Sequence, residues 1–160
     1  MRAILTRHAV LAAALVSAVL WSHQDAWAQE LPRQLRAEID GDVRDCTLKK
    51  TAFVPQFIAR KDLNGDGVMD FILDYGGYKC GTLAGRYCNG AGCRMEVYVS
   101  KGRTGYVKVF GGTVRELRFG TANGRPAILL SRQGRACGKT EAGPCRTTLT
   151  WDGTRFAEAR

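Results

Sequence analysis

Histidine is the residue type that this sequence most lacks. The 160 residues include two, His8 and His23, and both fall within the first 28 positions. The remainder therefore has no histidine for a Ser-His-Asp triad, a Cys-His pair or a histidine-ligated zinc or iron centre. Serine is nearly as scarce: beyond those positions stand Ser100 and Ser131, and neither lies in a G-x-S-x-G motif. We therefore expect that the protein is not an enzyme.

A long apolar run is also missing. The longest, Ala9 to Leu20, has twelve residues, whereas a transmembrane helix needs about 20. Positive residues precede this run and Ala26-Trp27-Ala28 follows it, a pattern typical of a cleaved secretory signal peptide. The sequence predicts a signal peptide over residues 1–28, a single domain over 29–160 and no later transmembrane segment. The expected location is periplasmic or secreted; the alternative is a retained N-terminal anchor.

Acidic residues are outnumbered by basic ones. Two of the 24 Lys and Arg residues and one of the 15 Asp and Glu residues lie in the first 28 positions, so the remainder carries 22 against 14, a net charge of +8. Such a surface attracts anionic partners. One function is therefore a polyanion-binding envelope protein for lipopolysaccharide, anionic polysaccharide or nucleic acid, with several cations near aromatic residues (Arg115, Arg118, Arg125, Arg132, Arg135). The competing interpretation is a solvated surface of evenly spread arginines.

Cysteine is present in an even number. All six cysteines lie beyond the predicted signal peptide: Cys46, Cys80, Cys88, Cys93, Cys137 and Cys145. In an oxidising compartment this count predicts three disulfides. A zinc site is the rival interpretation, but zinc sites usually contain a C-x-x-C pair, and the closest spacing here, Cys88 to Cys93, has four residues between.

Hydrophobic periodicity favours strands. Aliphatic residues alternate with Glu96, Tyr98 and Ser100 in Met95–Ser100, and similar segments are Phe53–Arg60, Asp70–Tyr75, Tyr106–Phe110, Val114–Phe119, Pro126–Ser131 and Thr147–Trp151. Gly111-Gly112, Asn123-Gly124 and Asp152-Gly153 are typical of tight hairpins. Leu31 to Val43 is the one helical candidate, with Pro32 in its first turn. The predicted fold is mainly β: an antiparallel meander of about 6–8 strands, one short N-terminal helix and disulfide staples.

An internal repeat relates the two halves of this domain. Asp66 to Leu73 matches Asn123 to Leu130 at an offset of 57, and the same offset aligns Cys80 with Cys137 and Cys88 with Cys145. We therefore expect two related hairpin units, over about residues 60–100 and 117–156. Symmetry would pair Cys80 with Cys88, Cys137 with Cys145 and Cys46 with Cys93. The rival scheme pairs Cys46 with Cys80 and Cys88 with Cys93, and keeps Cys137 with Cys145.

One acidic loop has the spacing of a metal site. In Asp62-Leu63-Asn64-Gly65-Asp66-Gly67-Val68-Met69-Asp70, oxygen side chains occupy positions one, three, five and nine, with glycine at six. This pattern suits Ca²⁺, with Asp62, Asn64, Asp66 and Asp70 as side-chain ligands and Val68 as a carbonyl ligand. An EF-hand is excluded because its twelfth position would be Leu73 rather than Glu. The later copy, Thr121 to Ala127, has no carboxylate, so we expect one metal site.

The string D-L-N-G-D-G-x-x-D followed by an apolar strand resembles the Ca²⁺ loops of FG-GAP and VCBS-type β-repeats, as in integrin α-chain propellers. The resemblance covers Arg60 to Tyr75 and implies a structural Ca²⁺ held between two strands by the same five residues. The whole chain also resembles small exported proteins of Gram-negative bacteria with this loop and several cysteines, for which no activity is implied. Two units are too few to close a propeller.

Two shorter segments have two interpretations each. Asp40-Gly41-Asp42 with Asp45 is either a weak second cation site or a turn. Trp151 beside Asp152-Gly153 is either a sugar-stacking indole or a core residue that ends a strand.

The leading function is an exported, calcium-binding and disulfide-stabilised binding or structural module. Its partner is unknown; an anionic envelope component or another exported protein is the candidate. A Ca²⁺-assisted hydrolase is the remaining alternative, and Glu96, Glu116 and Glu141 are its unassigned glutamates.

Overall fold

The computed structural model describes residues 31–48, 50–81, 83–102, 104–138, 140 and 143–158. The predicted signal peptide lies outside the described residues. In chain order the elements are α1 (Arg33–Arg44), β1 (Thr51–Phe53), η2 (Pro55–Phe57), β2 (Ile58–Lys61), β3 (Asp70–Asp74), η3 (Tyr75–Gly77), β4 (Tyr78–Cys80), β5 (Leu83–Ala84), β6 (Cys88–Asn89), β7 (Gly92–Ser100), β8 (Tyr106–Val114), β9 (Glu116–Ala122), β10 (Arg125–Gln133), η4 (Gly134–Cys137), β11 (Pro144–Trp151) and β12 (Phe156–Glu158).

These strands form three antiparallel sheets. The central sheet has five strands: β2-β3-β7-β6 in that order, with β8 also paired to β7. The second is ordered β12-β11-β10-β9 and the third β1-β4-β5. The predicted mainly β, antiparallel class is therefore confirmed. The strand number was underestimated, because twelve strands occur among the described residues and several of them have two or three residues.

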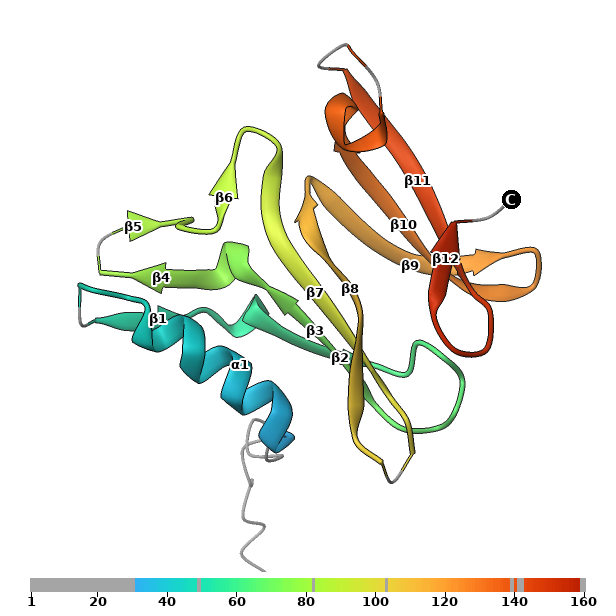
Figure 1. Cartoon of the computed structure of the whole chain (residues 1–160), viewed down its shortest axis with the longest axis horizontal. Helices are drawn as coiled ribbons and strands as arrows, with labels where there is room; N and C mark the ends of the chain where they lie inside the picture. The colour runs from blue at the N-terminus through green and yellow to red at the C-terminus, as the bar shows by residue number, and fades with distance from the viewer. Residues whose placement is uncertain are drawn as a thin grey trace, which may run out of the picture. The chain divides into compact units, whose positions relative to one another are not determined.

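The central sheet has an apolar cluster on each face. Strand β7 shows how alternation produces this arrangement, since Tyr98 belongs to one cluster while Val97 and Val99 belong to the other. The first cluster includes Leu35 and Ile39 of α1. The second includes residues of β10, β11 and β12. The molecule thus has α1 on one side of the central sheet and the β9–β12 sheet on the other (Figure 1).

All six cysteines are paired, which confirms three disulfides. The bonds join Cys46 to Cys80, Cys88 to Cys93 and Cys137 to Cys145. The symmetric scheme was therefore wrong and its rival correct. The reason is local: Cys88 and Cys93 are directly opposite each other in the β6–β7 ladder. Cys80 lies at the end of β4, opposite Thr51 of β1, and so close to Cys46.

Two sequence patterns did not form the predicted elements. Gly111-Gly112 is not a turn, because both glycines continue β8 and pair with Glu96 and Met95 of β7. Proline also interrupts the segment predicted as a strand over 53–60: Pro55 begins the short helix η2, which separates β1 from β2. By contrast, Asn123-Gly124 is the expected tight turn, with φ of 52° and 73°.

The two predicted repeat units contain comparable elements. In each, a strand pairs with the next strand, a 3₁₀ helix follows, and a third strand pairs with the second: β2-β3-η3-β7 and β9-β10-η4-β11. The duplication itself remains a prediction from the sequence.

Candidate metal centre

The loop from Asp62 to Asp70 joins β2 to β3 in a hairpin. Lys61 and Asp70 are opposite each other where the two strands meet. Between them the backbone curls through Gly65 and Gly67, whose φ angles are 81° and 80°. A Cβ at either glycine would meet no atom within 4 Å. The left-handed backbone, rather than lack of space, is therefore the reason for glycine at these two positions.

Asp70 is the buried member of the loop, with 0% of its surface exposed. Its Oδ1 accepts the Ser100 N–H at 2.7 Å and its Oδ2 accepts the Leu63 N–H at 2.7 Å. Burial raises the pKa of Asp70, and repulsion from Asp66 and Asp62 raises this pKa further, against the lowering effect of the two N–H groups. Asp62 and Asp66 are thus close enough to Asp70 to repel its charge.

Asp62 organises the exposed part of the loop. Its Oδ1 accepts the Gly65 N–H at 2.7 Å and its Oδ2 accepts the Gly67 N–H at 2.9 Å. These bonds hold the backbone in the tight curve that the spacing predicts. A carboxylate offers about four lone-pair sites, so Asp62 keeps acceptor capacity on both oxygens.

Asp66 is held from three directions. Its Oδ1 accepts the Val68 N–H at 2.8 Å, while its Oδ2 accepts the Asn64 Nδ2–H at 3.1 Å and the Ser100 hydroxyl. The bond from Ser100 is the main reason that the pKa of Asp66 lies below its ordinary value, followed by the bond from Val68. Asp66 therefore stays ionised at neutral pH.

Ser100 is the residue of this centre that sequence reasoning missed. It is 3% exposed, and its N–H and hydroxyl donate to Asp70 and Asp66 respectively. Its carbonyl also accepts the Asn64 Nδ2–H at 3.3 Å. Ser100 ends β7, 36 residues after Asn64, and nothing in its local sequence indicates this contact.

The donor chemistry of the loop fits a hard cation, although the arrangement does not yet surround one point. The four polar side chains carry oxygen ligands of the kind that Ca²⁺ prefers. Among the described residues, no set of three or more His, Cys, Asp and Glu side chains is arranged to hold a metal ion. Asp66 Oδ1 accepts one bond and keeps a lone pair for an ion, and Val68 would contribute its carbonyl oxygen.

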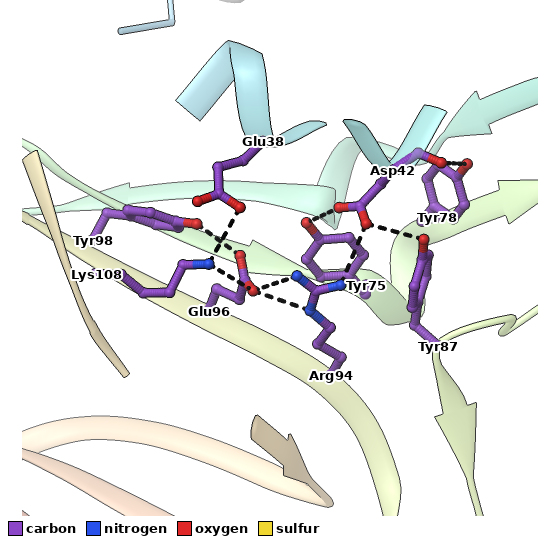
Figure 2. Close-up of polar contacts among 9 residues, drawn as sticks. All are labelled: Glu38, Asp42, Tyr75, Tyr78, Tyr87, Arg94, Glu96, Tyr98 and Lys108. Atoms are coloured by element: carbon purple, nitrogen blue, oxygen red, sulfur yellow. Dashed lines mark hydrogen bonds and ion pairs between the residues drawn. The ribbon is translucent and has the colours of Figure 1, made fainter. Parts of the chain in front are cut away.

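A second polar centre lies beneath α1, and it was not predicted. We call it the arginine–tyrosine cluster, and Figure 2 shows its nine residues: Glu38, Asp42, Tyr75, Tyr78, Tyr87, Arg94, Glu96, Tyr98 and Lys108. Asp42 of α1 accepts hydrogen bonds from the hydroxyls of Tyr75 and Tyr87, and its carbonyl accepts one from Tyr78. Asp42 therefore fixes α1 to the sheet rather than ligating a second cation. The predicted turn at residues 40–42 is instead part of α1.

Arg94 and Glu96 form the centre of this cluster. Arg94 Nη2 lies 2.6 Å from Glu96 Oε1 and Arg94 Nη1 lies 3.3 Å from Asp42 Oδ1. The guanidinium also lies over the Tyr75 ring, 4.4 Å from its centroid. Burial alone would lower the pKa of Arg94, but its bonds to Glu96 hold that pKa above the ordinary value.

Glu96 is 3% exposed and also accepts bonds from Lys108 and Tyr98. Burial alone would raise the pKa of Glu96, but the bonds from Arg94, Tyr98 and Lys108 together hold it below its ordinary value. The same environment raises the pKa of Tyr98, through burial first and the bond to Glu96 second.

The other residues that the sequence analysis named as possible functional residues do not lie together. Glu116 pairs with Arg118 on exposed β9, apart from the contacts of Glu96, and Glu141 lies outside the described residues. Of the clustered arginines, Arg115 donates to the Gly90 carbonyl and Arg132 stacks over Phe110. Trp151 ends β11 and packs against Phe156, with ring centroids 5.1 Å apart.

In comparisons with protein-family models, curated proteins and solved structures, the chain matches none. The likeness of the loop to FG-GAP and VCBS-type repeats therefore stays a prediction. Over the part of the chain that the structure describes, no helix combines the length and apolar character needed to cross a membrane.

Proposed function

We propose that the protein is an exported, disulfide-stapled β module in which the loop from Asp62 to Asp70 binds one structural Ca²⁺. The observation that carries the proposal is that Asp62 and Asp66 repel buried Asp70 within a loop that has the ligand spacing of a Ca²⁺ site. Half-buried Asp62 and exposed Asp66 both raise the pKa of buried Asp70. A divalent cation would relieve this repulsion.

The structural context favours a clamp. The loop connects two strands of the central sheet, and Asp66 and Asp70 also contact Ser100 at the end of a third strand, β7. An ion held here would tie the β2–β3 hairpin to β7. The three disulfides support the predicted export, since such bonds persist in oxidising compartments.

The proposal is tested by thermal unfolding of the oxidised protein in Ca²⁺ and in chelator. A site of the extracellular type has a Kd of about 0.1–1 mM, so about 10 mM Ca²⁺ should raise the free energy of unfolding by roughly 1.4–2.7 kcal/mol. The corresponding rise in Tm is roughly 5–10 °C.

Two matched variants identify the site. Asp62→Asn should abolish the rise, because it removes one of the three charges that attract the ion. Asp152→Asn is the control: Asp152 is a turn carboxylate that, like Asp62, accepts two backbone N–H bonds, from Thr154 and Arg155. This control should keep the full rise. An unchanged Tm of the parent protein in Ca²⁺, or an equal loss in both variants, would refute the proposal.

A further inference from the structure

Three connections lie at one end of the two packed sheets and enclose a groove. They are the loop after β2, the turn between β7 and β8, and the turn between β11 and β12. Figure 1 shows the first and third of these side by side. The groove has a volume of about 410 Å³, within the range of about 300–1,000 Å³ typical of small-molecule sites. Its lining residues are Asn64, Asp66, Ser100, Lys101, Gly102, Trp151, Gly153 and Thr154.

One wall of the groove is an indole. Trp151 packs against Phe156 and the second apolar cluster, yet it remains partly exposed and lines the groove. A rigid aromatic surface anchored in this way can cover the apolar C–H face of a sugar ring at low cost in conformational entropy. The indole therefore has the support that a stacking platform requires.

The other walls of the groove are polar and carry charges of both signs. Asp66 and Lys101 carry opposite charges, and Asn64 and Thr154 add an amide and a hydroxyl. Gly102 and Gly153 contribute bare backbone, and a Cβ at either would meet nothing within 4 Å. Donors and acceptors surrounding one aromatic face match a ligand with many hydroxyl groups.

Lys101 is the strongest single indication. Among the described residues its ammonium group makes no hydrogen bond or ion pair, although it lines the same groove as ionised Asp66. With its three donors unused it is available to a ligand. Because the charges of Lys101 and Asp66 oppose each other, the groove favours a neutral ligand over a strongly anionic one.

We infer that this groove binds a neutral saccharide, with Trp151 stacking on the ring and Lys101, Asp66, Asn64 and Thr154 contacting its hydroxyl groups. The inference goes beyond the proposed ion site, because the stacking residue and the ammonium group lie outside the loop from Asp62 to Asp70.

The sequence offers a direct optical test. Of the three tryptophans, Trp21 and Trp27 precede residue 28. In the oxidised full chain carrying Trp21→Phe and Trp27→Phe, Trp151 is the sole indole and its emission reports the groove. The probes are neutral trisaccharides of glucose, mannose, galactose and N-acetylglucosamine, and a heparin-derived tetrasaccharide. At least one neutral probe should change the emission saturably at about 20 mM or below, with a millimolar Kd.

Lys101→Ala should weaken that binding roughly fivefold, the effect of one hydrogen bond. Lys79→Ala, an exposed lysine of β4 outside the groove lining, should leave it unchanged. The inference is overturned if no neutral probe changes the emission, if Lys101→Ala and Lys79→Ala behave alike, or if the heparin fragment alone binds.

Repeating the titration in Ca²⁺ and in chelator separates this inference from the proposed function. A Tm that rises with Ca²⁺ while the neutral probes stay silent would retain the ion site and remove the saccharide site. Saccharide binding of equal strength in both buffers, with no Tm response to Ca²⁺, would do the reverse.

Discussion

Ser100 donates its backbone N–H to Asp70 Oδ1 across 30 residues of sequence, in a buried hydrogen bond of 2.7 Å. The same carboxylate receives the Leu63 N–H on its other oxygen. The end of β7, the start of β3 and the first part of the acidic loop are therefore held by a single side chain. Asp70 thus has a structural role whether or not an ion is bound.

This role predicts a large effect for Asp70→Asn. An amide has one acceptor oxygen, so one of the two buried N–H groups would lose its partner and face an NH₂ group. The free energy of unfolding should fall by about 2 kcal/mol, and Tm by roughly 5–10 °C. The measurement is urea or thermal unfolding in chelator, which removes any contribution of an ion.

Asp74→Asn is the matched control, because Asp74 ends the same strand and its Oδ1 accepts one exposed N–H, from Gly76. The amide oxygen can replace that acceptor, and the change should stay within about 0.5 kcal/mol. Equal losses in the two variants would show that the paired N–H groups of Asp70 are not decisive.

The ionisation of Glu96 makes the free energy of unfolding depend on pH in the acid range. Its pKa is lowered in the folded protein, so its contribution is fully present above the ordinary Glu pKa of about 4.3 and is lost as the pH falls through the lower folded value. Glu96→Gln should cost about 2 kcal/mol at pH 7, because Arg94 and Lys108 lose their shared carboxylate. The difference between parent and variant should shrink as the pH falls below the ordinary Glu pKa of about 4.3, measured by denaturant unfolding across pH.

Glu116→Gln provides the comparison, since the Glu116 and Arg118 side chains of that pair are 50% and 72% exposed. Such a pair contributes about 0–1 kcal/mol, and its removal should leave the pH profile nearly unchanged. A Glu96→Gln profile parallel to the parent profile down to pH 3 would contradict the role given to Glu96.

The disulfides should differ in their contributions to stability. Cys46–Cys80 joins residues 34 apart in sequence and Cys88–Cys93 residues 5 apart. Loop-closure entropy then predicts losses of about 4 and about 2 kcal/mol when each pair is replaced by alanine. Denaturant unfolding of the two double variants measures both, and an inverted order would contradict the entropic account.

The sequence allowed the β class and the acidic loop to be predicted because both depend on neighbouring residues. Alternation in β7 and the glycines of the loop are local signals. The pairing of Cys88 with Cys93 was decided by a two-stranded ladder, and an assumed repeat symmetry could not foresee that register. Ser100 was missed because its partners are 30 or more residues distant.

The arginine–tyrosine cluster could not be predicted from the sequence for a different reason. Its members come from α1, from η3, from strands β4, β7 and β8, and from the connection between β5 and β6. Each member alone resembles an ordinary surface charge or core aromatic. Glu96 in particular lies in an alternating strand, where the pattern predicts a solvent-facing residue. Helix α1 covers that face instead, and the charge is compensated by Arg94 and Lys108.

Because the central sheet has separate apolar clusters on its two faces, α1 can detach while the second cluster stays closed. Such a local opening would expose Leu35 and Ile39 and break the hydrogen bonds of Asp42 to Tyr75 and Tyr87, and would leave the second cluster intact. Cys46 follows α1 directly and is bonded to Cys80, so a released helix would remain tethered at high effective concentration. The disulfide therefore keeps a detached α1 close to the sheet and favours its return over global unfolding.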